Sequence, residues 1–463
     1  MTNFSNITTE IGLDYDVFPT EAIELSPEFI EQAIEISSTI PNEERQWRTY
    51  LNALALYGFE EWLGSRVIDL TSNQALCSVL QPPTANAIDA VCNLNVNGFK
   101  LCLITTGSLT DEEVTLPRAV VDLPEFIPHF YVLIEIQEEL SIATVLGFLS
   151  HEQLVNERAT LNLQAEEDWT YQLPVDCFDA DLDQLLLYLR CLEPTAIRLP
   201  ESLSNRSMQL SRMRSHLETL LPQLHSPDRQ FWQVLTWEQA SVVLTSPELL
   251  NWVYQVQRQS EDTGMSAQQD TDASNASLQN HLKDILQLLT QPAVNAGRWL
   301  WNELDELAQQ LSWVLLPSLA TRSALRQQLR SPAEEFKAIA KQLSRSGLEI
   351  SPQARGAYRD LLLGGTPLRL YALTWPLLSG SVPEWTLLLI LGAPLETSLP
   401  RGLKLRISDQ ARILVERVSD ENDNSSYFFT SVIGSLDEKF IVTISLTPGI
   451  EQILPPFGFN LER

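Results

Sequence analysis

DAVCNLNVNGFKLCLIT, at residues 89–105, is the stretch that decides the fold of the N-terminal part of the chain. Its Asn-Gly pair lies between two runs in which apolar and polar residues alternate. Both residues of a two-residue hairpin turn need a positive φ, which Asn and Gly adopt readily, so the stretch predicts a β-hairpin. Two-residue closure puts three apolar pairs on one face: Val96 with Phe99, Leu94 with Leu101, and Cys92 with Leu103.

The segments around this hairpin predict further helices and strands. Residues 41–66 place apolar side chains at spacings of three and four, which indicates an amphipathic helix with Asn42 as its cap. Alternating runs then predict a second hairpin over 129–149 and another strand over 168–174. Together these elements predict an acidic N-terminal domain of mixed α/β structure over residues 1–205.

A further helix is expected where three aspartates precede a leucine-rich run. Asp179, Asp181 and Asp183 come first and Arg190 comes last, which suits the two ends of a helix dipole. Aspartates at alternate positions also occur in calcium loops, but the turn glycine and the bidentate glutamate of such a loop are missing. The pattern therefore favours helix capping over a metal site.

The rest of the chain predicts a helical middle and a β-rich end. Residues 206–257 and 281–363 have helical periodicity, and between them 258–280 loses nearly every large apolar residue, which predicts a flexible linker. Short runs typical of strands, separated by turn residues, fill 364–463. They predict an antiparallel β-sandwich or barrel, so the expected fold class is α+β.

The charge of the chain is concentrated near its N-terminus. The 463 residues include 31 Lys and Arg against 60 Asp and Glu, a formal net charge of -29. Residues 1–201 alone hold 8 basic and 33 acidic side chains. An acidic domain of this kind repels phosphate backbones, which disfavours nucleic acid as a partner, and it attracts basic proteins.

Motifs that carry chemistry are scarce. The sequence has no P-loop, no Gly-x-Gly-x-x-Gly, no nucleophile elbow and no His-Glu-x-x-His. Its five histidines are scattered and its five cysteines form no Cys-x-x-Cys, so we expect neither a disulfide framework nor a zinc site, and no cofactor.

One set of polar residues follows the order of a metal-dependent nuclease core. Asp89, Asp122, Glu135 and Gln137 are expected on or beside strands that follow the first long helix. Such a core needs carboxylates that hold a divalent ion and usually a lysine that activates water. Here Gln137 occupies the lysine position and Lys100 belongs to another hairpin. An active nuclease, or an inactive descendant of one, is therefore the alternative interpretation.

Several segments in order resemble the cyanobacterial domain-of-unknown-function family numbered 1822, over roughly 41–200 and 364–459. This resemblance implies a cyanobacterial cytoplasmic protein from a gene neighbourhood of signalling components, and it transfers no catalytic or binding residue. The segments that carry it are WRTYLNALALYGFEEWL, NVNGFKLCLI, HFYVLIEIQEELSIATVLGFLSHEQL, DWTYQLP, LLLYLRCLEPTAIRLP, GGTPLRLYALTWPLL, PEWTLLLILGAPLETSLPRGLKLRISD, LDEKFIVTISL and LPPFGF.

The interpretation that follows is a non-enzymatic protein-interaction or regulatory scaffold. Its acidic N-terminal domain would dock a basic signalling or transcription partner by presenting carboxylates where phosphates would otherwise lie. The N-terminus lacks a basic segment followed by an apolar run, and the lipophilic region 373–394 is interrupted by Pro, Gly and Glu, so a cytoplasmic protein without a membrane span is expected. Candidate interaction residues are aromatic or acidic: Trp62, Glu138, Glu139, Trp169 and Trp385.

Overall fold

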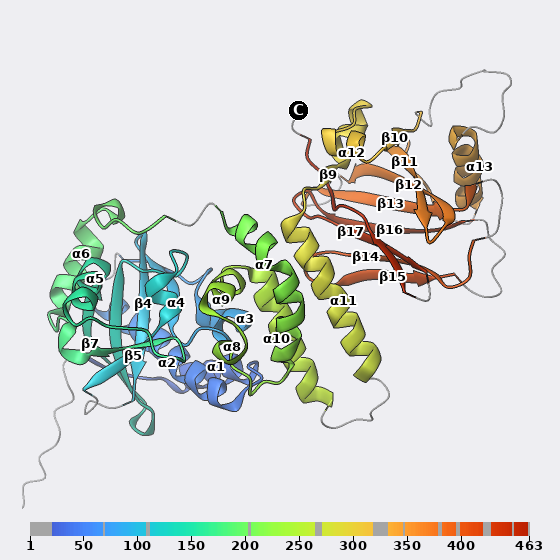
Figure 1. Cartoon of the computed structure of the whole chain (residues 1–463). Coiled ribbons are helices and arrows are strands. Elements are labelled where there is room, and N and C mark those ends of the chain that lie inside the picture. Colours follow the sequence, from blue (N-terminus) through green and yellow to red (C-terminus); the bar gives the residue numbers. More distant parts are fainter. Residues whose placement is uncertain are drawn as a thin grey trace, which may run out of the picture. The chain divides into compact units, whose positions relative to one another are not determined.

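The chain forms two compact units in the computed structural model (Figure 1). The first unit consists of residues 1–203 and 226–250, and the second of residues 204–225 and 251–463. The expected boundary near residue 205 lies close to the end of the first segment of this unit. The chain then returns to the same unit at residues 226–250, and the helical periodicity of 206–257 gave no sign of that return. The structure describes residues 21–67, 70–107, 112–201, 205–263, 271–317, 332–345, 348–377, 382–394, 399–419, 427–446 and 449–461.

The first unit is built on a six-stranded sheet. Only β4 and β6 run parallel among its neighbouring pairs, and the other neighbours are antiparallel. In spatial order the strands are β1 (Ala22–Glu24), β7 (Ile142–Ser150), β6 (Phe130–Gln137), β4 (Phe99–Thr106), β3 (Val91–Val96) and β2 (Ser72–Asn73).

The hairpin of β3 and β4 confirms the turn and two of the three predicted pairs. Val96 lies opposite Phe99 and Leu94 opposite Leu101, but Leu103 lies opposite Val91 and not opposite Cys92. The register shifts because β3 has a bulge between Val91 and Leu94, where Asn93 has a φ of 60°. The predicted pair of Cys92 with Leu103 is therefore wrong by one residue.

Helix α2 (Glu43–Arg66) covers one face of this sheet and confirms the predicted helix over 41–66. Asn42 caps it by accepting a hydrogen bond from the Arg45 backbone N–H at 3.0 Å. Gly58 lets the helix approach the sheet closely, because a Cβ added there would overlap the Cβ of Ala143 on β7. Helix α1 (Pro27–Ser38) precedes α2 and packs against it.

Helix α6 (Leu182–Cys191) confirms the helix expected after the three aspartates and packs into the same core as α2. Asp181 is its cap and accepts a hydrogen bond from the Gln184 N–H at 3.3 Å. Asp179 accepts from the N–H of Asp181 at 2.9 Å. Two of the three aspartates thus order the start of the helix, as the capping interpretation requires.

The remaining elements of the first unit include a two-stranded ribbon. Its strands, β5 (Glu113–Pro117) and β8 (Thr170–Pro174), pair antiparallel. β8 confirms the strand expected over 168–174, whereas β5 was not predicted. Short helices complete the unit: α3 (Pro82–Ala85), α4 (Arg118–Asp122), α5 (His151–Thr160), α8 (Phe231–Val234) and α9 (Trp237–Leu244).

The segment expected as a linker, 258–280, is helical wherever the structure describes it. Helix α10 (Pro247–Thr263) continues into it and helix α11 (Thr271–Thr290) begins inside it. Polar composition suggested a flexible segment, but Ser, Gln and Asp also suit the exposed face of a helix whose other face packs. Residues 264–270 of the predicted linker lie outside the described part of the chain.

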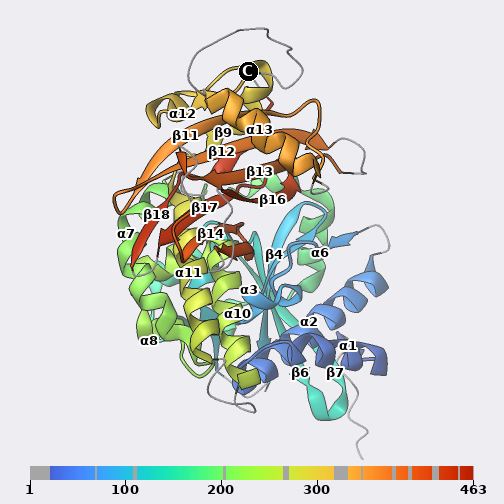
Figure 2. The ribbon, with the colours of Figure 1, turned by 90° about the vertical axis from the view of Figure 1, so that its right-hand side faces the viewer.

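The second unit contains two antiparallel sheets packed face to face (Figure 2). The larger has the order β10 (Val314–Leu315), β11 (Arg355–Leu363), β12 (Thr366–Leu377), β13 (Glu384–Gly392) and β16 (Tyr427–Ser435). The smaller has the order β15 (Ile413–Val418), β14 (Leu403–Ser408), β17 (Ile441–Leu446) and β18 (Ile450–Ile453). Their facing apolar side chains form one core, as expected for antiparallel strands at the C-terminal end.

The expectation of continuous helix over 281–363 is wrong in its second half. Strand β11 lies at 355–363, and the short strands β9 (Val294–Asn295) and β10 precede it. The α-helices described in this region are the end of α11, α12 (Glu306–Gln310) and α13 (Pro332–Arg345). Helix α7 (Arg206–Leu220), from earlier in the chain, packs against α11. In RGAYRDLLL the alternation of strand β11 is weak, which explains the error.

Helices cover the outer faces of both sheets of the second unit (Figure 2). Helix α13 packs Phe336 and Leu343 on the larger sheet. Helix α11 places Asp284 against Arg406 of β14, with the carboxylate 0% and the guanidinium 3% exposed. No helix in the described part of the chain is long and apolar enough to cross a membrane. Within the lipophilic region 373–394, residues 373–377 belong to β12 and residues 384–392 to β13.

Candidate functional site

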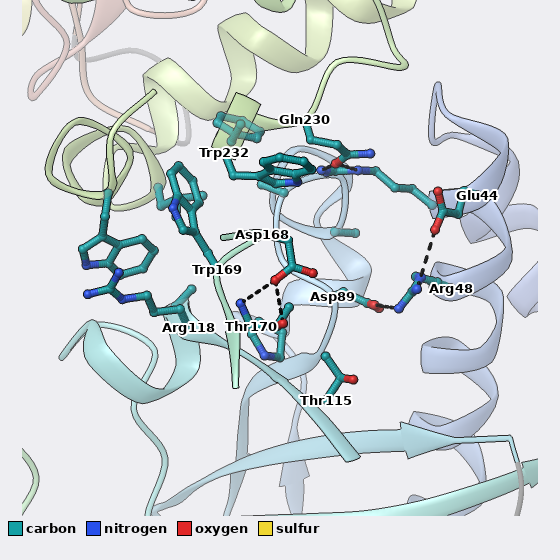
Figure 3. Close-up of a pocket in the computed structure, with 18 of the residues that line it drawn as sticks. Glu44, Arg48, Asp89, Thr115, Arg118, Asp168, Trp169, Thr170, Gln230 and Trp232 are labelled. Carbon is teal, nitrogen blue, oxygen red and sulfur yellow. Dashed lines mark hydrogen bonds and ion pairs between the residues drawn. The ribbon is translucent and has the colours of Figure 1, made fainter. Parts of the chain in front are cut away.

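A cavity of about 400 Å³ in the first unit gathers aromatic and charged side chains (Figure 3). Its walls come from the first turns of α2, the segment after α3, the β5–β8 ribbon, and helices α8 and α9. With Arg118 and Ala119 of α4, segments from five separate parts of the sequence therefore meet here.

Three tryptophans line the cavity. The rings of Trp169 and Trp237 meet edge to face, with centroids 5.4 Å apart. The guanidinium carbon of Arg118 lies 4.4 Å from the Trp237 ring centroid, which is the distance of a cation–π contact. Trp232 is 39% exposed, a large fraction for an indole, and so leaves aromatic surface open to a ligand.

Trp169 has an unusual backbone conformation with a φ of 63°. The turn around it is held by the Asp168 Oδ1 atom, which accepts hydrogen bonds from the Thr170 N–H at 3.2 Å and from the Thr170 hydroxyl at 2.7 Å. The Trp169 carbonyl also accepts from the Arg118 N–H at 2.8 Å. A left-handed conformation costs a bulky residue roughly 1–2 kcal/mol, so these bonds must hold the turn in place.

Two arginines from the first turns of α2 lie on the wall opposite this turn. Arg48 donates to Asp89 at 2.6 Å and lies 3.6 Å from Glu44, and the Asp89 carboxylate raises the pKa of Arg48. Arg45 donates to the side-chain oxygen of Gln230 through Nε at 3.1 Å, and also through Nη2. Burial lowers the pKa of Arg45 to about 10, so this guanidinium still carries its charge at neutral pH.

The third arginine of the cavity, Arg118, is anchored by Asp122. Its Nε donates to the Asp122 carboxylate at 2.7 Å, and Arg158 donates to the other carboxylate oxygen at the same distance. The Tyr171 hydroxyl donates to Asp122 at 3.1 Å, and burial raises the pKa of this phenol. Asp122 thus links α4, α5 and β8 and fixes Arg118 on the Trp237 ring.

Of the four residues of the nuclease interpretation, Glu135 and Gln137 bond to each other, whereas Asp89 and Asp122 each have other partners. Asp89 accepts from Arg48 and from Asn52, and Asp122 accepts from the two arginines and the tyrosine described above. Glu135 is buried on β6 and accepts from Gln137 at 3.0 Å. Among the described residues no group of three or more His, Cys, Asp or Glu side chains is placed to hold a metal ion.

The five candidate interaction residues differ in their surroundings. Trp62 and Trp385 are fully buried in the cores of the first and second unit, so they contact core side chains. Glu138 and Glu139 are exposed in the turn between β6 and β7. Of the five, Trp169 alone lines the cavity.

Sequence reasoning missed most of the cavity. The stretch FWQVLTW at 231–237 carries two tryptophans in a short helical segment, and this density is the one local signal for the site. Nothing local indicates that it lies beside Asp168 and Arg118, because those contacts join segments far apart in the chain. The pairing of Arg48 with Asp89 likewise spans 41 residues.

Residues 23–454 match the model of a family described as a protein of unknown function (DUF1822). The chain belongs to this family. The match covers both units and confirms the family drawn from the sequence segments, and it also includes residues 201–363, which the resemblance left out. The family description names no organism and no activity. Searches of curated proteins and of solved structures find no match to the chain.

Proposed function

We propose that this member of the family is a non-enzymatic protein-interaction or regulatory scaffold that docks a basic partner through its first unit. The observation that supports this most strongly is the separation of charge between the units. The first unit has 9 basic and 36 acidic side chains, a net charge of -27, and the second has a net charge of -2. A field of this strength raises the rate at which a basic protein meets the surface.

Acidic side chains of the first unit are available to a partner. Glu138 and Glu139 are exposed at the β6–β7 turn, and Asp183 is exposed in the first turn of α6. Carboxylates at such positions keep their hydration and cost the fold little. They can therefore meet the lysines and arginines of a signalling or transcription protein, where they would occupy the place of nucleic-acid phosphates.

The competing class is a metal-dependent nuclease-like enzyme or its inactive descendant. It would require Asp89, Asp122 and Glu135 to share a divalent ion. Arginines or an amide donate to each of these carboxylates, which favours positioning roles for all three. A calorimetric titration of the full chain with Mn²⁺ tests this class. Metal binding that disappears in the Asp89→Ala and Glu135→Ala variants would overturn the scaffold proposal.

The scaffold proposal is tested with the full chain as bait in a cell lysate, washed at rising NaCl concentration. A basic partner named by mass spectrometry is then purified and titrated against the wild type and two charge-reversal variants. Glu138→Lys with Glu139→Lys changes the first unit, and Glu349→Lys with Glu384→Lys makes the same change at exposed positions of the second.

We expect the affinity to fall as salt rises and to drop by about tenfold in the first variant alone, because electrostatic docking is screened by ions and depends on local charge. An affinity that is indifferent to salt and equal in both variants would contradict docking through the acidic unit.

A further inference from the structure

We propose that the tryptophan-lined cavity of the first unit binds the guanidinium group of an arginine side chain in a basic polypeptide, with Asp168 as its counter-ion. This inference rests on the proposed function and names the chemistry by which the first unit would recognise its partner. The cavity volume of about 400 Å³ is large enough for a side chain of this size.

Asp168 is the carboxylate of the cavity wall that can accept a new cation. Glu44 and Asp89, the other two, are already paired with Arg48. Asp168 uses Oδ1 for both bonds to Thr170, and within the described part of the chain its Oδ2 has no donor and the carboxylate has no cationic partner. Figure 3 shows this carboxylate pointing into the cavity. A guanidinium could bind it through a charge-assisted hydrogen bond.

The aromatic wall suits a planar cation. Arg118 already lies on the Trp237 ring at 4.4 Å, so the cavity contains one guanidinium on one indole. Trp232, which is 39% exposed, offers a second indole without a ring or cation partner among the described residues. Arginine stacks on aromatic faces better than lysine because its charge is spread over a plane.

The arginines of the wall are held by their own partners. Arg48 is bound to Asp89 and Glu44, Arg118 to Asp122, and Arg45 to Gln230. Gln230 is uncharged and Asp122 is shared with Arg158, so the four arginines at the site are balanced by four carboxylates, Glu44, Asp89, Asp122 and Asp168. The unit as a whole carries a net charge of -27. The long-range field therefore attracts cations toward the cavity and repels anions.

A neighbouring cavity favours a polypeptide over a free small cation. It has a volume of about 380 Å³ and shares Glu44, Arg48, Asp89 and Thr115 with the first cavity, so the two adjoin. Trp47, which is 51% exposed, lines the second one. A peptide whose arginine occupies the first cavity could lay a neighbouring residue in the second.

The test uses two fluorescein-labelled ten-residue peptides, which differ only in having arginine or lysine at the central position of a Gly-Ser-Lys background. Fluorescence anisotropy measures their binding to the full chain and to four variants. Asp168→Asn keeps the Oδ1 acceptor and removes the charge, and Trp232→Ala removes the open indole. Asp176→Asn is the matched charge control from the same unit, and Trp301→Ala is the matched aromatic control from the second unit, where Trp301 is 37% exposed.

We expect Asp168→Asn and Trp232→Ala each to lower the affinity for the arginine peptide by about tenfold. The two control variants should change this affinity by less than about twofold. The lysine peptide should bind the wild type several-fold more weakly. Circular dichroism and thermal unfolding of each variant exclude loss of fold as the cause.

Three outcomes would overturn the inference. An equal loss of affinity for the arginine peptide in Asp168→Asn and Asp176→Asn would show that only the general electrostatic field of the unit attracts the peptide. That result would be compatible with the proposed function. Equal affinity for the arginine and lysine peptides would exclude guanidinium recognition. If neither peptide binds the wild type, the cavity is not a site for basic side chains, and the separate charge-reversal experiment decides the proposed function.

Discussion

The two units of the chain differ in net charge and in how deeply they bury an ion pair. The first unit has four times as many acidic as basic side chains, 36 against 9, and leaves acidic residues such as Glu138 and Glu139 in contact with water. The second unit is nearly neutral, yet it buries Asp284 and Arg406 between α11 and β14. The comparison separates a surplus of exposed acidic side chains in the first unit, for which we propose a role in recognition, from a buried ion pair that attaches a helix to a sheet in the second.

The units also differ in how a helix is fixed to a sheet. In the first unit α2 lies against β7 through close backbone packing at Gly58. In the second, Arg406 donates two hydrogen bonds to Asp284, at 2.9 and 3.1 Å, and Ser408 donates a third at 2.6 Å. In the first unit the helix is fixed by close packing at a residue without a side chain, and in the second by a hydrogen-bonded ion pair.

The largest effect is expected from breaking the buried ion pair. Arg406→Met leaves the Asp284 carboxylate buried without its cation, which should lower the free energy of unfolding of the second unit by about 3–5 kcal/mol. Urea unfolding measures the loss, and hydrogen exchange should show it as faster exchange in β14 and β17.

Two further variants sharpen this result. Arg298→Met removes a partly exposed pair with Glu303, at 3.4 Å, and should cost less than about 1 kcal/mol. The double variant Asp284→Leu with Arg406→Met removes both charges and should recover part of the stability. A single Arg406→Met variant as stable as Arg298→Met would refute the attachment role of the buried pair.

The corresponding change in the first unit is Gly58→Val. The added side chain would overlap Ala143 of β7 and force α2 away from the sheet, so we expect a loss of about 2–3 kcal/mol in the free energy of unfolding. Gly64→Ala in the same helix is the control. No atom lies within 4 Å of a Cβ added at Gly64, and alanine there should stabilise the helix by about 0.5–1 kcal/mol. Equal effects at both glycines would mean that close packing at Gly58 is unimportant.

Local patterns predicted much of the fold. The Asn97-Gly98 turn, the apolar spacing of α2 and the alternation of β6, β7 and the C-terminal strands are signals within about 25 residues of sequence. The bulge at Asn93 escaped prediction because one residue with positive φ changes the register without changing the apolar pattern. Strand β11 was missed because its neighbours, and not its own residues, decide its pairing.

The candidate site was far less predictable than the fold. Trp169 was singled out as an aromatic residue, but its partner Trp237 is 68 residues away and joins it through tertiary packing. Asp284 and Arg406 are separated by 122 residues and carry no shared motif. Periodicity reports which face of an element is buried, whereas polar contacts between distant elements leave no periodic signal.

A smaller effect is expected from pH, through the buried His281 of the second unit. Burial lowers its pKa, against the influence of Asp284 and Asp409, so the folded unit favours the neutral ring. The contribution of neutral His281 to the free energy of unfolding is therefore complete above the unfolded pKa of about 6.5. It is lost as the pH falls below that value, because the unfolded chain then binds a proton that the folded unit does not. At pH 7.5 and 5.5 we would compare wild type with His281→Gln by urea unfolding. The stability difference between them should shrink by about 1 kcal/mol at the lower pH. A constant difference would show that the folded unit accepts the proton.

The smallest effect on stability is expected from the acidic surface of the first unit. Glu138→Gln with Glu139→Gln removes two exposed negative charges from a unit of net charge -27, and should leave the free energy of unfolding within about 0.5 kcal/mol of wild type. The sign should be a slight gain, because neutralising these residues relieves like-charge repulsion. Urea unfolding at low salt measures it. A loss above about 1 kcal/mol would show that these carboxylates support the fold, and the difference between the two units would then be structural. Stability that stays unchanged while affinity for a basic partner falls would place the function of these charges in recognition.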